Sequence, residues 1–419
     1  MDSIIVRGGH RLNGTVSTSG SKNAALPILF ASLLADGQHR FTNVPYLKDI
    51  ESTQSLLESL GASSAREDDT LVVDVSSPAA HVADYEMVRK MRAGILCLGP
   101  LLARYGEAKV SLPGGCAIGS RPIDLHIETM RRLGADITSE GGYVIARAQR
   151  LVGDRILFEK VTVGGTENAL MAASLARGIT IIENAAKEPE VVDLANYLIA
   201  MGAKIEGAGT SVISIEGVDE LSPASHRIVP DRIEAGTLLI AGAITGGKVT
   251  VDNCIPGHLQ SLVEKMRDAG FRIDTDDSSL TVQATKSWQA VDIATAPHPG
   301  FPTDLQAQFM ALMTQASGTS VITEQIFENR FMHVQELVRL GADITTMSQV
   351  AVVRGNSGGL GAAPVMATDL RASASLVLAG LVAEGETEVS RIYHLDRGYE
   401  HLENKLASLG ADIERVAAE

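Results

Sequence analysis

The feature that most constrains the fold is a tripeptide of the Leu-Gly-Ala type that recurs along the whole chain. Its glycine stands at six positions spaced by about 70 residues: Gly61, Gly134, Gly202, Gly270, Gly341 and Gly410. Each glycine follows a segment with apolar residues at helical spacing, such as Leu262, Val263 and Met266 before Gly270. Glycine is the usual residue just past the end of a helix. The pattern therefore predicts one structural unit used six times.

Two further landmarks recur with the tripeptide. An Ala/Leu-rich stretch such as "NALMAASLA" is followed by a glycine that opens a strand-like run, for example "GITIIEN". After the tripeptide, most copies carry a short alternating segment such as "LTVQA". Long apolar runs favour buried helices and alternation favours strands. Each copy is therefore predicted to fold as helix, strand, helix, strand, strand.

The two ends of the chain suggest how the copies close into domains. The sixth copy stops at "ADIERVAAE", before its last strand, whereas residues 3–20 are strand-like and precede the first helix. We expect these N-terminal strands to complete a C-terminal domain of residues 1–21 and 230–419. Residues 22–229 would form the N-terminal domain, with an active site in the cleft between the two. The alternative, an open solenoid, is disfavoured because solenoid repeats are typically about 20 to 45 residues long.

Composition excludes several classes of function. A net charge of -15 argues against nucleic acid or an anionic membrane as partner. No apolar run reaches the roughly 20 residues of a membrane span, and "MDSIIVRGGHRL" lacks the features of a signal peptide, so a cytoplasmic location is expected. The cysteines, Cys97, Cys116 and Cys254, are too scattered for a disulfide framework or a zinc site, and the first and last are interpreted as buried hydrophobes. No metal and no cofactor are expected, and the oligomeric state stays open.

The loops that enter the apolar helices carry many of the charged residues. Helix N-termini attract anions, so several of them around one cleft would bind an anionic ligand even on an acidic protein. A basic residue at a helix start opposes the helix dipole, which favours a ligand contact over a solvated side chain. Four residues are interpreted in this way: Lys22, Arg92, Arg371 and Arg397. By contrast, Thr303, Thr368 and Asp369 are expected to be N-caps.

Cys116 lies in the glycine-rich stretch "LPGGCAIGSRP", which can bring a side chain and backbone amides close to a ligand. A free thiol has a pKa of about 8.5 and is mostly protonated at neutral pH. Cys116 is therefore a candidate general acid. A nucleophilic role would call for a neighbouring histidine. The only one nearby in sequence, His126, falls on a predicted helix. A cysteine that merely fills space is the remaining alternative.

Seven long stretches are too specific to be explained by the repeat alone. They read "SGSKNAALPILFASLLA", "LPGGCAIGSRPIDLH", "TIIENAAKEPEVVDLANYL", "TAPHPGFPTDLQAQF", "FENRFMHV", "ATDLRASASLVLAG" and "IYHLDRGYE". Together they resemble the UDP-N-acetylglucosamine enolpyruvyl transferases, a branch of the EPSP synthase superfamily. The resemblance implies a two-domain inside-out α/β barrel of six βαβαββ-type units, three in each domain.

The resemblance also implies a reaction and its two small-molecule substrates. The enolpyruvyl group of phosphoenolpyruvate is transferred to the 3-hydroxyl of UDP-N-acetylglucosamine by addition and elimination, and phosphate is released. This reaction is the first committed step of peptidoglycan precursor synthesis, and it uses neither a metal nor a cofactor. Two alternatives are kept: a transferase that acts on shikimate 3-phosphate, which shares the fold but lacks the "GGC" loop, and a non-catalytic repeat scaffold.

The matching positions imply the site residues. Cys116 matches the proton donor to the phosphoenolpyruvate methylene, and Asp304 the carboxylate that orients the sugar hydroxyl or takes its proton. The residues implied in catalysis are Cys116, Asp304, Lys22 and Arg397. Those implied to bind phosphoenolpyruvate are Lys22, Asn23, Arg121, Arg371 and Arg397. Those implied to bind UDP-N-acetylglucosamine are Arg92, Arg121, Pro122, Ile123, Asp124, Leu125, Lys160, Val161, Thr162, Val163, Asp304 and Ile326.

Overall fold

The computed structural model describes residues 2–76, 80–88, 91–112, 123–285, 287–355 and 358–417. Three predicted site residues, Cys116, Arg121 and Pro122, lie outside the described residues. The described chain divides into two compact units. The N-terminal unit comprises residues 20–112 and 123–229, with the gap at 77–79 and 89–90, and the C-terminal unit comprises the described residues of 2–19 and 230–417.

The N-terminal unit contains three four-stranded sheets of one topology. In each sheet an edge strand runs parallel to its neighbour, and the remaining pairs are antiparallel. The strand orders are β14 (Ser225–Arg227), β3 (Gln38–Thr42), β5 (Thr70–Asp74), β4 (Ser63–Glu67); β6 (Val82–Ala83), β7 (Glu107–Ser111), β9 (Tyr143–Arg147), β8 (Asp136–Glu140); and β10 (Arg155–Leu157), β11 (Ile179–Glu183), β13 (Val212–Glu216), β12 (Lys204–Glu206).

The helices of this unit fall into two kinds. Helices α1 (Lys22–Ala31), α4 (Leu98–Tyr105) and α6 (Val163–Ala173) are the Ala/Leu-rich ones, and every residue from 24 to 31 in α1 is buried. A helix that is apolar all round must lie inside the core. Strands such as β5 alternate buried and half-buried residues and so cover this core with one face. The remaining helices are α2 (Lys48–Ser59), α3 (Tyr85–Val88), α5 (Asp124–Arg132) and α7 (Pro189–Ala200), each of which also carries exposed residues.

The C-terminal unit repeats this plan. Its strand orders are β2 (Asn13–Ser17), β15 (Lys248–Asp252), β17 (Ser279–Gln283), β16 (Arg272–Thr275); β18 (Ile293–Ala294), β19 (Thr319–Thr323), β21 (Val350–Arg354), β20 (Asp343–Met347); and β23 (Val365–Met366), β25 (Glu386–Ser390), β1 (Ser3–Arg7), β26 (Asp412–Val416). Its buried helices are α8 (Arg232–Ile244), α10 (Gln306–Met313) and α12 (Leu370–Gly380), and the others are α9 (Gln260–Asp268), α11 (Val334–Arg339) and α13 (Leu402–Ser408). A small pair, β22 (Leu360–Gly361) and β24 (Ala383–Glu384), adds to it. Helices inside and sheets outside give each unit the inside-out barrel that the family resemblance implies.

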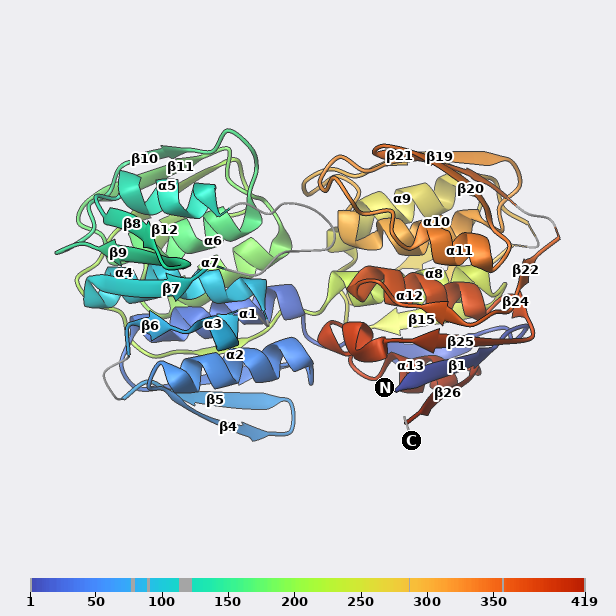
Figure 1. Ribbon diagram of the computed structural model, residues 1–419, viewed down its shortest axis with the longest axis horizontal. Coiled ribbons are helices and arrows are strands. Elements are labelled where there is room, and N and C mark those ends of the chain that lie inside the picture. Colours follow the sequence, from blue (N-terminus) through green and yellow to red (C-terminus); the bar gives the residue numbers. More distant parts are fainter. Residues whose placement is uncertain are drawn as a thin grey trace. The chain divides into compact units, whose positions relative to one another are not determined.

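The N-terminal strand β1 fills the position that the sixth copy lacks. It pairs antiparallel with β25 on one side and β26 on the other, with Val6 opposite Thr387 and Ile413. Figure 1 shows β1, in blue, beside these strands at the red end of the chain. Ile4 and Val6 point into the core with no exposed surface. In the other five four-stranded sheets of the described chain, this position is held by the third strand of the same copy.

The repeat glycines adopt the backbone conformation that the sequence pattern requires. All six have left-handed φ values between 93° and 108°, a region open to glycine because it has no Cβ. In the sixth copy α13 begins at Leu402, and the buried Tyr399 lies before it although Tyr399, Leu402, Leu406 and Leu409 stand at helical spacing. Among the described residues, no helix combines the length and the apolar character that crossing a bilayer requires.

Candidate active site

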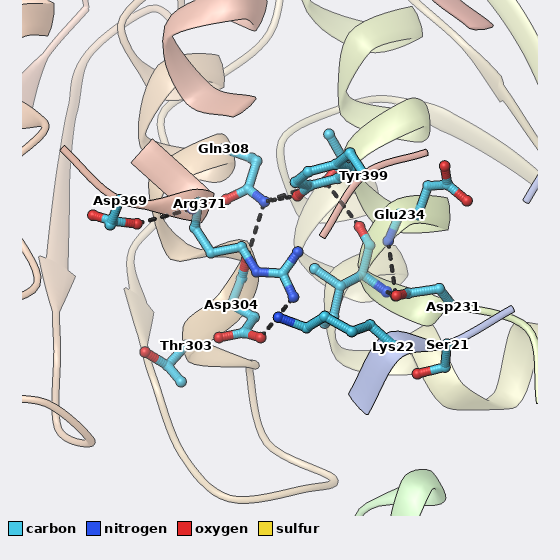
Figure 2. A network of polar contacts seen from close by, with 12 residues as sticks. Ser21, Lys22, Asp231, Glu234, Thr303, Asp304, Gln308, Asp369, Arg371 and Tyr399 are labelled. Carbon is cyan, nitrogen blue, oxygen red and sulfur yellow. Dashed lines mark hydrogen bonds and ion pairs between the residues drawn. The ribbon is translucent and has the colours of Figure 1, made fainter. Parts of the chain in front are cut away.

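Asp304 is held between two arginines of the C-terminal unit. It lies in the 3-10 turn Thr303–Leu305, directly before α10. Its Oδ1 accepts a hydrogen bond from Nη2 of Arg330 at 2.8 Å, and its Oδ2 accepts one from Nη2 of Arg371 at 2.9 Å. The arginine side chains are only 6% and 5% exposed, whereas Asp304 keeps 25% of its side chain exposed. Both carboxylate oxygens are therefore held by guanidinium groups, and Figure 2 shows Arg371 reaching Asp304.

The two arginines decide the charge of Asp304. Burial by itself would raise the pKa of this carboxyl, but the charges of Arg371 and Arg330 and their hydrogen bonds hold it well below its usual range. Asp304 is therefore ionised at neutral pH. A carboxylate with a low pKa accepts hydrogen bonds well but is a weak base.

One amino group of Arg371 lacks a hydrogen-bond partner among the described residues. Arg371 lies in the first turn of α12, where Asp369 accepts hydrogen bonds from the amides of residues 371 and 372, so the predicted N-cap is confirmed. Its guanidinium carbon lies 5.3 Å from the ring centroid of Tyr399, a cation–π distance. Its Nη1 is buried and finds no hydrogen-bond partner within the described residues. An anionic ligand group would satisfy that atom.

The predicted capping roles of Thr303 and Thr368 are wrong. The hydroxyl of Thr303 donates to Oε2 of Glu324 at 2.8 Å and accepts from Nη1 of Arg330 at 2.7 Å, instead of capping a helix. The hydroxyl oxygen of Thr368 is buried without a hydrogen-bond partner in the part of the chain that the structure describes. Asp369, not Thr368, caps α12, and Thr303 is the first residue of its 3-10 turn rather than the residue before it.

The reasoning that led to Arg397 also needs correction. Arg397 ends the 3-10 helix Ile392–Arg397 rather than starting a helix, so it does not oppose a helix dipole. This short helix packs against α12, which carries Arg371. The charge of Arg397 adds to burial in lowering the pKa of His394. Its assignment as a ligand contact therefore rests on the family resemblance.

Lys22 and Asn23 begin α1 in the N-terminal unit. Ser21 caps this helix through a hydrogen bond from the amide of Ala24 at 3.4 Å. The Nζ of Lys22 donates to Oδ2 of Asp49 at 3.2 Å, with side chains 12% and 5% exposed. Asp49 supplies an anion within the protein, which weakens the argument that Lys22 must have a ligand.

The predicted nucleotide-sugar contacts of the N-terminal unit lie around one histidine. Ile123 and Thr162 are the N-cap residues of α5 and α6. The ring of His126 packs so closely against the first turn of α6 that an ideal Cβ on Gly164 would lie 3.1 Å from its Cε1. Burial, helped by the charge of Arg92, lowers the pKa of His126 to about 4, so it is neutral at physiological pH. The structure thus brings the first turn of α6 against His126 of α5, with Arg92 close enough to affect the pKa of that ring.

Asn168 fixes this arrangement. Its Nδ2 is 2.9 Å from Nδ1 of His126 and 3.1 Å from the carbonyl of Ile95, and its Oδ1 accepts from the amide of Gly99 at 2.8 Å. The side chain joins α5, α6 and the segment that starts at Arg92. Sequence reasoning missed Asn168, because nothing in its local pattern marks a contact with residues about 70 positions away.

Hydrogen bonds inside the protein limit how two of the predicted contacts can act. The hydroxyl of Thr162 accepts from the amide of Gly165 at 3.1 Å, and its carbonyl accepts from Thr166. The amide of Ile326 donates to Glu324 at 2.9 Å, while its side chain is 36% exposed. A ligand would therefore meet the carbonyl or side chain of Ile326 rather than its amide.

The other chemically reactive groups have structural roles in the described residues. Cys97 and Cys254 are buried, and burial raises their thiol pKa values to about 12 and about 11, which confirms them as unreactive core residues. No group of three or more His, Cys, Asp or Glu side chains within the described ranges has the arrangement of a metal site.

Comparison with known proteins identifies the family. The family model EPSP synthase (3-phosphoshikimate 1-carboxyvinyltransferase) matches residues 6–406. The chain belongs to the EPSP synthase family. Within this family, a relative from Bdellovibrio bacteriovorus is 68% identical over 413 residues, covering 99% of this chain and 100% of the relative. One from Myxococcus xanthus is 58% identical over 421 residues, covering 100% of both. Both are named UDP-N-acetylglucosamine 1-carboxyvinyltransferase.

Solved structures of the family confirm the predicted fold. The enolpyruvyl transferase NikO from Streptomyces tendae superposes with a TM-score of 0.90 at 26% identity, covering 100% of this chain and 99% of that chain. The EPSP synthase from Acinetobacter baumannii superposes with a TM-score of 0.76 at 18% identity and covers 100% of both chains. At that identity the second likeness concerns the fold alone.

Proposed function

We propose that this protein is a UDP-N-acetylglucosamine 1-carboxyvinyltransferase, which transfers the enolpyruvyl group of phosphoenolpyruvate to the 3-hydroxyl of UDP-N-acetylglucosamine. The observation that carries this function is the identity of 57% to 68%, over 99% to 100% of the chain, with relatives of that name. An EPSP synthase shares the fold at only 18% identity. Activity on shikimate 3-phosphate is therefore the weaker alternative, and a non-catalytic scaffold is excluded by the enzyme family.

The reaction consists of an addition and an elimination. In the addition, the sugar oxygen bonds to C2 of phosphoenolpyruvate, the hydroxyl loses its proton, and C3 gains one. In the elimination, C3 loses a proton, the double bond forms again, and the C2–O bond to phosphate breaks. The protein must place one group beside the sugar hydroxyl, a proton donor beside C3, and cations around the phosphate and carboxylate.

Asp304 is the group that we assign to the sugar hydroxyl. A carboxylate has about four lone-pair sites and can accept several hydrogen bonds at once. The charge of Asp304 is secured by Arg330 and Arg371. Because its pKa is held low, orientation is its first role. It takes the proton only as the new C–O bond forms and the hydroxyl becomes acidic.

The anionic substrate is assigned to the basic residues. The unpartnered Nη1 of Arg371 supports a contact with the phosphate or carboxylate of phosphoenolpyruvate, since guanidinium groups match these anions in shape and charge. Lys22, Asn23, Arg121 and Arg397 are assigned there by the family resemblance. Cys116 is assigned as the proton donor to C3 on the same ground.

The nucleotide sugar is assigned to the cluster around His126. The N-termini of α5 and α6 lie together there, and Arg92 is close to them. Helix N-termini and a guanidinium together form an attractive place for a diphosphate. Asp124, Leu125, Lys160, Val161, Thr162 and Val163 belong to these two segments, whereas Pro122 and Ile326 are assigned by resemblance. We place the reaction in the cytoplasm, at the first committed step of peptidoglycan precursor synthesis.

Selective protection against thermal unfolding tests the proposed substrate. A ligand that binds only the folded protein at 100 times its dissociation constant adds about 2.7 kcal/mol to the free energy of unfolding. UDP-N-acetylglucosamine is expected to raise the unfolding temperature by several degrees, whereas shikimate 3-phosphate at the same concentration is expected to leave it unchanged. Protection by shikimate 3-phosphate alone would contradict the proposal and favour its alternative.

A further inference from the structure

We propose that Thr303, Arg330 and Glu324 form a positioning relay, which couples the backbone at Ile326 to the carboxylate of Asp304. These three residues are called the relay below. The inference rests on the proposed function, in which Ile326 and Asp304 both contact the nucleotide sugar. None of the three relay residues touches a reacting atom in this scheme, so they act through Asp304.

Glu324 is the fixed end of the relay. It follows β19 directly and is 1% exposed. Its Oε1 accepts from the hydroxyl of Thr295 at 2.9 Å and from the amides of Ile326 and Phe327 at 2.9 Å and 3.2 Å. Its Oε2 accepts from Thr303 at 2.8 Å. A buried carboxylate is stable when several donors satisfy its oxygens. One side chain thus fixes the turn that carries Ile326 and the loop that carries Asp304.

The hydroxyl of Thr303 gives the relay its direction. A guanidinium can only donate hydrogen bonds and an ionised carboxylate can only accept them. Thr303 Oγ1 must therefore accept a hydrogen bond from Nη1 of Arg330 and donate its own hydrogen bond to Oε2 of Glu324. Removing the Thr303 hydroxyl breaks both hydrogen bonds, whereas removing only the methyl group of Thr303 leaves them in place. Thr303 lies beside Asp304 on the same turn (Figure 2).

Arg330 links Thr303 to Asp304 through its two amino groups. One amino group binds Thr303 at 2.7 Å and the other binds Asp304 Oδ1 at 2.8 Å. Its guanidinium carbon also lies 5.1 Å from the ring centroid of Phe327, which belongs to the turn held by Glu324. The side chain is 6% exposed. Arg330 is therefore fixed from both ends, and it fixes the plane of the Asp304 carboxylate.

The relay becomes important during turnover. Arg371 is the second partner of Asp304 and is also the residue assigned to the anionic substrate. A substrate anion on Arg371 would compete with Asp304 for that guanidinium, so Arg330 is the partner that keeps Asp304 in place. A misplacement of about 1 Å can lower a rate about 100-fold. Loss of the relay is therefore expected to lower kcat more than the affinity for phosphoenolpyruvate.

The test compares Thr303→Val with Thr303→Ser. Valine keeps the shape of threonine but has no hydroxyl, and serine keeps the hydroxyl. Thr303→Val is expected to lower kcat by about 10-fold to 100-fold, with the KM for phosphoenolpyruvate changed by less than about twofold. Thr303→Ser is expected to restore most of kcat. Thr345→Val is the matched control, because the exposed Thr345 accepts a hydrogen bond from Arg354 at 3.1 Å on the surface of the same unit.

A second pair of variants shows whether the residues act as one unit. Because Glu324 and Thr303 both act through Arg330, Glu324→Gln combined with Thr303→Val should lower kcat by less than the product of the two single losses. Arg330→Lys removes the fork that reaches two partners, so it should give a similar loss of kcat if Thr303→Val fails to fold.

The outcomes separate the relay from the proposed function. If the wild-type protein releases phosphate with UDP-N-acetylglucosamine and the folded Thr303→Val variant keeps full kcat, the relay is wrong and the proposed function stands. Equal losses in Thr303→Val and Thr303→Ser would mean a packing role and would also overturn the relay. If the wild-type protein shows no transfer to the nucleotide sugar, the proposed function fails and the relay fails with it.

Discussion

Replacement of Asp304 by asparagine is expected to lower kcat by about a thousandfold. Positioned acid or base groups typically contribute about 100-fold to 10,000-fold to a rate. Asparagine has nearly the same shape, but it lacks the charge that Arg330 and Arg371 surround at 2.8 Å and 2.9 Å. It can neither take a proton nor balance two nearly buried guanidinium groups. Steady-state phosphate release at saturating concentrations of both substrates measures the effect.

This substitution also acts on stability, and the two effects must be separated. Breaking a buried ion pair from one side typically costs about 3 to 5 kcal/mol, and less here because Asp304 keeps 25% of its side chain exposed. The rate must therefore be measured at a temperature where the variant is fully folded. Asp343→Asn is the control, because Asp343 forms an exposed ion pair with Arg354 in the same unit. A folded Asp304→Asn variant with near-normal kcat would remove Asp304 from the chemistry.

Replacement of Glu167 by glutamine is expected to stabilise the protein by about 3 kcal/mol at pH 7. Glu167 lies in α6 and is 4% exposed. Burial raises its pKa to about 8, and the nearby Glu190 and Glu188 add to the effect. The Glu167 carboxyl loses its proton near pH 4.5 in the unfolded chain but only near pH 8 in the folded protein. Between these two pH values the folded protein keeps a proton that the unfolded chain has lost. The free energy of unfolding therefore falls by about 1.4 kcal/mol for each pH unit.

The stability difference between Glu167→Gln and the wild type is expected to grow with pH. Below about pH 4.5 both states are protonated, so Glu167→Gln and the wild type should differ little. As pH rises toward 8 the contribution of Glu167 to wild-type stability is lost, so the gap between the variants should widen and then become constant. Urea unfolding at several pH values measures it, with the exposed Glu206→Gln as control. A gap that does not change with pH would mean that Glu167 is ionised in the folded protein.

The periodic part of the fold could be predicted from sequence because its signals are local. A glycine after an amphipathic helix, an apolar run and an alternating strand each depend on neighbouring residues, and the structure has all six glycines in the left-handed region. The place of β1 followed from a strand missing at the other end of the chain. The start of the sixth helix could not be read from apolar spacing, because Tyr399 fits that spacing but lies before α13, where its hydroxyl is hydrogen-bonded to Thr237 and Gln308.

The site could be predicted only where the family resemblance or a helix start marked it. Asp304 and Arg371 were predicted in this way, and in the structure Nη2 of Arg371 lies 2.9 Å from Oδ2 of Asp304. Arg330, Glu324 and Asn168 carry no signal of their own, since their partners are far away in sequence and become neighbours only in the folded chain. The argument from helix dipoles failed for Arg397 because dipole effects need a defined helix start, and sequence does not fix helix limits to within a turn.

The most direct test of enolpyruvyl transfer to UDP-N-acetylglucosamine is to measure phosphate release from phosphoenolpyruvate and to determine the mass of the acceptor product by mass spectrometry. We predict that release requires UDP-N-acetylglucosamine, and that one nucleotide sugar gains one enolpyruvyl group for each phosphate released. Release that depends instead on shikimate 3-phosphate, or no release with either acceptor, would contradict the account.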